Sequence, residues 1–220
     1  MWITNQLGVA TWSEAGAEWE IDARGGQAIS FGFQDEASVQ LKPVDGKTLP
    51  VADEHFVRGR CWNINYPQAG HRHALRIAFE PIETAADSML LEATISIQTD
   101  LLDSHPKVDI HFDGKLIKKM SVPGASPRPV NQSGSSGVTL AKSKQNFTAI
   151  FLGVHDSPFT TDLSTSESLQ LRLFGEFLEK GVIRKARPWI LIRRATNEPS
   201  DSELQAISQR LAERPLPLAF

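Results

Sequence analysis

The chain has 220 residues, of which 40% are hydrophobic and 22% charged, with a formal net charge of −3. This balance is typical of a globular protein rather than a disordered or membrane-spanning one, and the charge argues against nucleic acid as a partner. Cys61 is the only cysteine, so no intrachain disulfide or cysteine-based zinc site can form. The N-terminal residues show no secretory or membrane pattern, so we expect a cytoplasmic protein.

Alternating apolar and polar residues dominate the first half of the chain. The pattern is clearest over residues 74–81 and 90–98; in the first of these, Leu75, Ile77 and Phe79 share one face. Such alternation is typical of antiparallel strands with one face on a core and one in water. Weaker candidate strands in this half cover residues 7–12, 19–23, 28–33, 39–41 and 61–66.

Residues 108–122 are predicted to form a β-hairpin. Asp113 and Gly114 have the chemistry of a two-residue type I′ turn, which requires positive φ at both central positions. This turn would bring opposite charges together on one face and apolar residues on the other. The expected register pairs Phe112 with Lys115, Ile110 with Ile117, and Asp109 with Lys118.

Later strands are expected over residues 137–141, 146–154, 169–178 and 182–192. Residues 146–154 are apolar on both faces, which predicts a central strand. A second hairpin, turning at residues 179–181, would join the last two segments. Within it, Pro188 should lie at an edge or a bulge, because proline has no amide proton for a ladder.

The C-terminal region alone is predicted to be helical. Ser200 and Glu203 form a capping box, and Leu204, Ile207 and Leu211 follow at helical spacing. Two prolines then end the helix, and the apolar tail beyond them should dock on the sheet.

The fold class predicted from these elements is all-β. An antiparallel β-sandwich, mutarotase-like or jelly-roll-like, would span residues 1–195, with residues 196–220 packed on the same domain. Residues 123–137 are rich in proline, glycine and serine. We expect a loop there that is mobile or functional, and that limited proteolysis would cut first, after Arg128.

His71 and His73 are the sharpest candidates for chemistry. If the strand over 74–81 extended backward, both would lie above the apolar face. Such a pair suits a divalent metal, as in cupin-type barrels, but the glutamate of the cupin pattern is missing. Two nitrogens cannot hold an ion tightly, so a simple polar entrance to the strand is the competing interpretation, and we expect no metal and no cofactor.

The loop after the strand over 90–98 contains Asp100, Asp103 and His105. Loops on rigid sheets often carry function, and an enzyme could use Asp103 as an acid beside a histidine base. The same residue types also form ordinary turns.

A third candidate segment combines arginine, asparagine and aromatic residues. Such residues bind sugar hydroxyls and stack on sugar rings, provided that the aromatic side chains are exposed rather than buried in the core. The candidate ligand-binding residues are Arg58, Arg60, Trp62, Asn63, Asn65, Tyr66 and Arg72.

Two further sets have simpler explanations. Asp109, His111 and Asp113 alternate on one face, but pairing with Lys118 and the turn account for the two aspartates. His155, Asp156 and Ser157 follow a strand without the nucleophile elbow of a serine hydrolase.

These residues leave several functions open. The aromatic and arginine residues on a long sandwich are similar to carbohydrate-binding and mutarotase-like sandwiches, an analogy of architecture. A non-catalytic module that binds a saccharide or a protein partner is the first hypothesis. The alternatives are a carbohydrate-active epimerase, lyase or hydrolase using His71 or His73 as base, and a metal-dependent enzyme. Neither nucleic acid nor a membrane is an expected partner.

Overall fold

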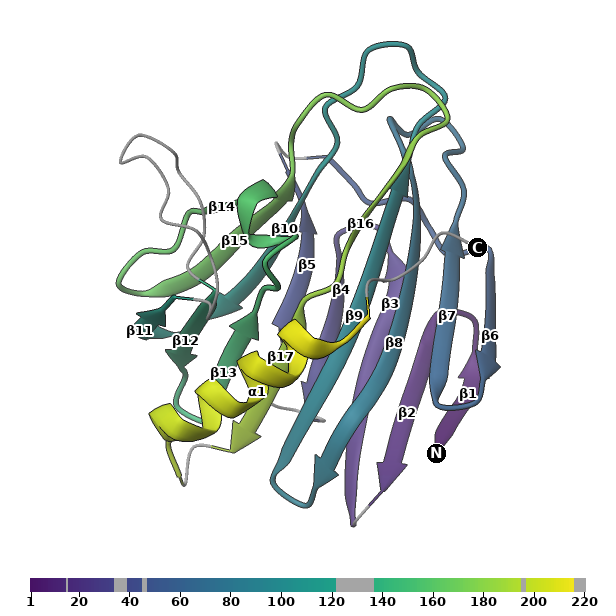
Figure 1. Ribbon diagram of the computed structural model, residues 1–220. Helices are drawn as coiled ribbons and strands as arrows, with labels where there is room; N and C mark the ends of the chain where they lie inside the picture. Colours follow the sequence, from purple (N-terminus) through teal and green to yellow (C-terminus); the bar gives the residue numbers. More distant parts are fainter. Residues whose placement is uncertain (15, 34–38, 45–46, 122–136, 195–196, 216–220) are drawn as a thin grey trace.

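The computed structural model describes residues 1–14, 16–33, 39–44, 47–121, 137–194 and 197–215. Over these ranges, two large antiparallel β-sheets face each other, and a single α-helix lies against the outside of one of them (Figure 1). The prediction of an all-β antiparallel sandwich with a C-terminal helix is therefore confirmed.

The first sheet contains eight strands within the described residues. Their order across the sheet is β1-β2-β3-β4-β5-β10-β15-β14. They are β1 (Trp2–Gln6), β2 (Val9–Glu14), β3 (Ala17–Gly25), β4 (Ala28–Phe33), β5 (Val39–Pro43), β10 (Lys107–Asp113), β14 (Thr160–Asp162) and β15 (Ser168–Phe174).

The second sheet contains nine strands over the same described residues. Eight of them follow the order β11-β12-β13-β17-β9-β8-β7-β6, and the ninth, β16, pairs with β9 beside this path. They are β6 (Glu54–Arg58), β7 (Cys61–Tyr66), β8 (Ala74–Ala85), β9 (Ser88–Gln98), β11 (Lys115–Met120), β12 (Val138–Lys142), β13 (Asn146–Phe151), β16 (Ile183–Ala186) and β17 (Trp189–Arg194). A short 3-10 helix, η1, spans Ser157–Phe159.

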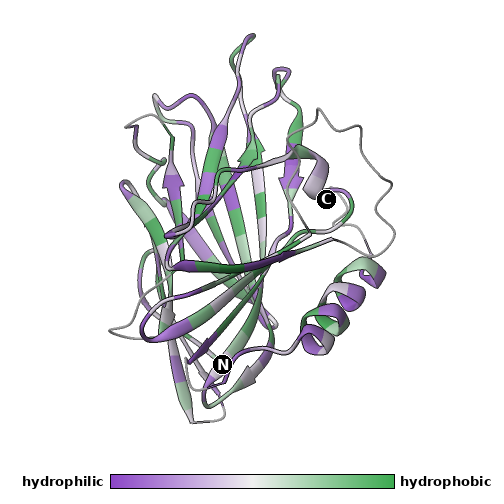
Figure 2. Cartoon of the chain, turned by 90° about the vertical axis from the view of Figure 1, so that its left-hand side faces the viewer, coloured by the Kyte–Doolittle hydropathy of each residue, from purple (hydrophilic) through white to green (hydrophobic). Residues whose placement is uncertain are grey.

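The main core lies between the sheets. Leu75, Ile77 and Phe79 of β8 are buried in it, as their alternation predicted, and they pack with residues from both sheets. Figure 2 shows the matching alternation of hydropathy along many strands. Because each strand turns alternate side chains inward, the polar residues between them are left on the outer faces.

A second apolar cluster lies on the outer side of the second sheet, under α1 (Asp201–Glu213). Figure 1 shows the helix lying over this side of the sheet. Leu204, Ile207 and Leu211 of the helix are buried in one cluster with residues of β12, β13 and β17. This cover explains why β13 is buried on both faces. The predicted central strand is confirmed, although it ends at Phe151 rather than at residue 154.

The start of α1 follows its sequence signature. The Ser200 hydroxyl accepts the amide N–H of Glu203 at 3.2 Å, which satisfies one of the free donors of the first turn. The Glu203 carboxylate pairs with Arg193 of β17, and this contact, reinforced by the Ser200 amide, lowers its pKa. The cap therefore also ties the helix to the sheet.

The predicted hairpin over 108–122 is wrong. β10 pairs with β5 and β15 in the first sheet, whereas β11 pairs with β12 in the second. Asp113 and Gly114 therefore form a crossover between sheets, and Gly114 has no positive φ. Glycine is required here by lack of space instead. A Cβ at this position would lie 2.5 Å from the Phe112 ring and 2.9 Å from the Lys142 backbone.

The second predicted hairpin is also wrong, although its turn exists. The Val182 amide donates to the Glu179 carbonyl at 3.1 Å, and Gly181 has a φ of +80°. However, the two segments do not pair with each other, because β15 belongs to the first sheet and β16 pairs with β9 of the second. Pro188 occupies the break between β16 and β17, where its carbonyl accepts the Ala93 amide at 3.0 Å, so its expected place at an irregularity is confirmed.

Some expectations lie outside the described residues. They concern the loop that includes Arg128 and the docking of the tail beyond Pro215. Across the described ranges, no helix has the length and apolar character needed to cross a membrane.

Candidate functional site

A pocket of about 480 Å³ opens among the loops at one end of the sandwich. Its walls come from the β5–β6, β7–β8 and β9–β10 connections, which lie toward the upper end of the molecule in Figure 1. We call it the basic pocket. Its lining residues are Pro43, Val44, Lys47, Thr48, Leu49, Gly70, His71, Arg72, His73, Ser104, His105, Pro106 and Lys107.

Two of these loops are tied together by hydrogen bonds. The β7–β8 loop makes a tight turn in which the His71 amide donates to the Gln68 carbonyl at 2.6 Å. The Gln68 side chain accepts the Asp100 amide at 3.1 Å, and the Thr99 hydroxyl donates to the Arg72 carbonyl at 2.8 Å. The loop before β8 is therefore fixed against the loop after β9.

His71 and His73 precede the first residue of β8, Ala74, so the strand does not extend backward as the sequence suggested. Both still line the pocket. Burial is the main reason that the pKa of His73 is lowered to about 4, and the charges of His71 and Lys47 add to the effect. The imidazole of His73 is therefore neutral near neutral pH.

His73 and Ser104 also lack hydrogen-bond partners. Both ring nitrogens of His73 and the Ser104 hydroxyl are buried, and none bonds to another described residue. Ser104 is 1% exposed, and its backbone is held by a bridge to Leu178. A buried polar group without a partner costs about 1–3 kcal/mol, so these atoms are suited to hydrogen bonds with a bound molecule.

Cationic side chains surround these neutral groups. Lys47, Arg72 and Lys107 line the pocket, and no aspartate or glutamate in the described part of the chain does. Asp103 lies beside the pocket, with its carboxylate 3.6 Å from Nε2 of the partly exposed His105. The pocket can therefore supply positive charge and neutral hydrogen-bonding groups together.

Within the ranges that the structure describes, no group of three or more histidine, cysteine, aspartate or glutamate side chains could hold a metal ion.

No protein-family model and no curated protein sequence matches the chain.

The candidate residues of β6 and β7 do not join the pocket. Trp62 and Tyr66 point into the core with exposures of 0% and 1%, and the Tyr66 hydroxyl donates to the Ala23 carbonyl at 2.7 Å. Neither ring can stack on a sugar in this structure. Trp12, Trp19 and Trp189 are also buried, which agrees with the alternative that the aromatic side chains fill the core.

The polar members of the same segment have local structural partners. Arg60 lies 4.8 Å from the centre of the Trp12 ring and donates to the Pro81 carbonyl, while Asn65 lies between Glu54 and Arg76. Asn63 contacts the Cys61 sulfur, and Arg58 is exposed at the edge of the sheet. Only Arg72 of the seven predicted ligand-binding residues lines the basic pocket.

The carboxylate of Asp109 is paired with residues other than Lys118, the partner expected from the sequence. Its buried carboxylate accepts two hydrogen bonds from Arg172, at 2.9 and 3.0 Å, and one from Gln170 at 2.7 Å. This follows from the pairing of β10 with β15. Lys118 instead contacts Asp201, at the start of α1.

Sequence reasoning found the three histidines of the pocket and Arg72, but not Lys47, Ser104 or Lys107. Isolated lysines carry no sequence signal, because most lie on a solvated surface. Ser104 lies between two singled-out residues, Asp103 and His105, and its burial depends on the bridge to the β15–β16 connection.

Proposed function

We propose that the protein is a non-catalytic binding module whose ligand is an acidic saccharide, held in the basic pocket. The observation that carries the proposal is the coexistence of unpartnered buried neutral groups, on His73 and Ser104, with the cations Lys47, Arg72 and Lys107. A pocket of this volume fits a small molecule rather than the surface of a protein partner.

The neutral groups and the cations of the pocket would bind two different parts of one ligand. The hydroxyls of a sugar can both donate and accept, which matches the Ser104 hydroxyl and the two nitrogens of a neutral imidazole. A carboxylate on the same sugar would pair with the lysine and arginine side chains, whose charge no described lining carboxylate neutralises. A neutral sugar would leave the cations unused, and a simple anion would leave the buried neutral groups unpaired.

The test is calorimetric titration of the protein with glucuronate, glucose and acetate. We expect saturable binding of glucuronate, and affinities for glucose and acetate that are lower by about tenfold or more, since each lacks one set of contacts. Lys107→Gln should weaken glucuronate binding by a similar factor. Lys180→Gln, at an exposed position that does not line the pocket, is the matched control and should have little effect.

Two results would contradict the proposal: equal affinity for all three compounds, or equal effects of the two lysine variants.

Proton NMR of the same mixtures also tests the enzyme alternative, in which neutral His73 removes a proton from the sugar. Appearance of an epimer, an unsaturated uronate or, with an oligosaccharide, a hydrolysis product would replace binding by catalysis as the function.

A further inference from the structure

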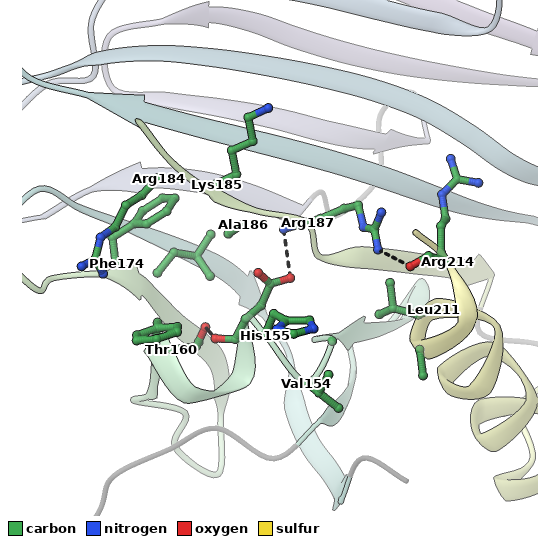
Figure 3. Close-up of a pocket in the computed structure, with 15 residues that line it drawn as sticks. Val154, His155, Thr160, Phe174, Arg184, Lys185, Ala186, Arg187, Leu211 and Arg214 are labelled. Atoms are coloured by element: carbon green, nitrogen blue, oxygen red, sulfur yellow. Dashed lines mark hydrogen bonds between the residues drawn. The ribbon is translucent and has the colours of Figure 1, made fainter. Parts of the chain in front are cut away.

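A second cavity, of about 510 Å³, lies where the end of α1 meets β15, β16 and the segment after β13. We call it the helix-end cavity. Figure 3 shows Phe174, Ala186 and Leu211 on its walls, together with His155, Arg187 and Arg214. None of its residues lines the basic pocket, so it is a separate site.

Much of the wall is apolar. Val154, Leu173, Phe174, Ala186 and Leu211 come from four different parts of the chain. Phe174 adopts a φ of +63°, a conformation that a bulky residue rarely takes and that costs free energy. Its partner across the ladder, Lys107, holds the backbone in place.

The carboxylate of Asp156 lines this cavity and, among the described residues, is only partly hydrogen-bonded. Its Oδ2 accepts the backbone N–H of Arg187 at 3.0 Å, the bond drawn to Arg187 in Figure 3. Among the described residues, Oδ1 has no hydrogen-bond donor and the carboxylate has no ion-pair partner. Burial raises the pKa of this group above its ordinary value, despite the Arg187 amide and the charges of Arg187 and His155.

The arginines near the cavity are already held by other groups. Arg187 donates to the carbonyls of Arg214 and Pro215, and Arg214 pairs with Glu80 and with Glu92, in each case at 2.8 Å. Arg184, which also lines the cavity, pairs with Glu176 at 2.6 Å. Their positive charge disfavours a ligand cation beside Asp156, while the carboxylate itself disfavours a ligand anion. An uncharged ligand avoids both costs.

We propose that the helix-end cavity binds a compact, uncharged and largely apolar molecule that donates one hydrogen bond, from a hydroxyl or N–H group, to Oδ1 of Asp156. Such a ligand would cover the walls formed by Phe174, Ala186 and Leu211 and would complete the hydrogen bonding of the carboxylate. This site is independent of the saccharide proposed for the basic pocket.

Calorimetric titration with three probes of one shape tests the proposal: 2-naphthol, 2-methoxynaphthalene, which lacks the donor, and the anion 2-naphthoate. We expect 2-naphthol to bind at one equivalent and about tenfold tighter than either of the others, because a hydrogen bond to a charged acceptor contributes about this factor. Tighter binding of 2-naphthoate, or equal binding of 2-naphthol and 2-methoxynaphthalene, would overturn it.

Two variants locate the bound probe. Asp156→Asn would turn an amide N–H₂ toward the cavity while its oxygen accepts from Arg187, so 2-naphthol should bind about tenfold more weakly and 2-methoxynaphthalene equally well. Ala212→Phe should fill the cavity and abolish binding of 2-naphthol. Ala206→Phe, also exposed on α1 but away from the lining, is its control and should bind normally. Unchanged 2-naphthol affinity in Ala212→Phe would show that the probe binds elsewhere.

Discussion

Single polar residues in this protein are buried in two different ways. Asp109 is 5% exposed, and its carboxylate is fully engaged by Arg172 and Gln170, so its burial is compensated by charge-assisted hydrogen bonds. Among the described residues, no group compensates His73 and Ser104 in this way. A fully hydrogen-bonded group such as Asp109 helps to fix which strands pair. A buried group without a partner lowers the free energy of unfolding, and a ligand that bonds to it would raise that free energy again.

The depressed pKa of His73 leads to a prediction about stability and pH. In the unfolded chain this histidine gains a proton as the pH falls through about 6.5, but in the folded chain only near about 4. The unfolded state therefore binds more protons between these values, and the free energy of unfolding should fall with pH. We expect His73 to account for roughly 2 kcal/mol of the loss between about pH 7 and about pH 5.

Urea titrations across this pH range would measure the effect. His73→Asn should flatten the pH dependence, whereas Ser104→Ala, in the same pocket but without a titratable side chain, should leave it nearly unchanged. If the two variants lose stability with pH as steeply as the parent chain, His73 is not the group that titrates.

At the scale of elements, local pattern predicted what a segment is but not what it pairs with. The period-two alternation of β8 and β9 and the capping box of α1 involve residues close in sequence, so each could be recognised directly. Alternation says which side chains share a face, but it does not name the neighbouring strand. The Asp113–Gly114 pair is a common turn, yet the strands around it separate into two sheets.

The same limit applies to the site. His71 and His73 were visible as a pair, and His105 as part of a loop. Their meeting with Lys47 and Lys107 depends on how three connections between strands are arranged at one end of the sandwich. This arrangement is set by long-range strand pairing, which residue patterns do not encode.

The crossover at Gly114 gives a prediction about packing. Because a Cβ would lie within 2.5–2.9 Å of Phe112 and of the Lys142 backbone, Gly114→Ala should destabilise by about 2–3 kcal/mol through overpacking. Gly59→Ala, where φ is +63° but the space around the Cβ is open, should cost only about 1 kcal/mol, from backbone strain. Chemical denaturation of both variants would compare the two costs, and an equal or smaller loss at Gly114 would contradict the crossover geometry.

On the scale of the whole molecule, the two sheets are interwoven along the chain. The backbone passes from one sheet to the other at the β5–β6, β9–β10, β10–β11, β13–β14 and β15–β16 connections. Neither sheet is therefore made from one continuous stretch of sequence. Loss of strands from one sheet also removes neighbours from the opposite face of the core.

We therefore expect the sandwich and its helix to unfold in one transition. Trp19 reports on the core between the sheets, and Trp189 on the cluster beneath α1. Variants that retain one of these tryptophans, with the others replaced by phenylalanine, should give coincident denaturation curves by fluorescence and by far-ultraviolet circular dichroism. An earlier transition for Trp189 would show that the helix layer separates first.

The position of β17 also matters while the chain is being synthesised. β17 lies between β13 and β9 near the middle of the second sheet, yet among the described residues it is the last strand in chain order. Until Trp189–Arg194 have left the ribosome, β13 and the first half of β9, residues 88–92, lack the partner that they have on that side in the folded protein. A nascent chain would then expose two apolar strand edges, which are ready templates for pairing with other chains. The growing polypeptide thus depends on its last strand to close a gap that the finished molecule no longer shows.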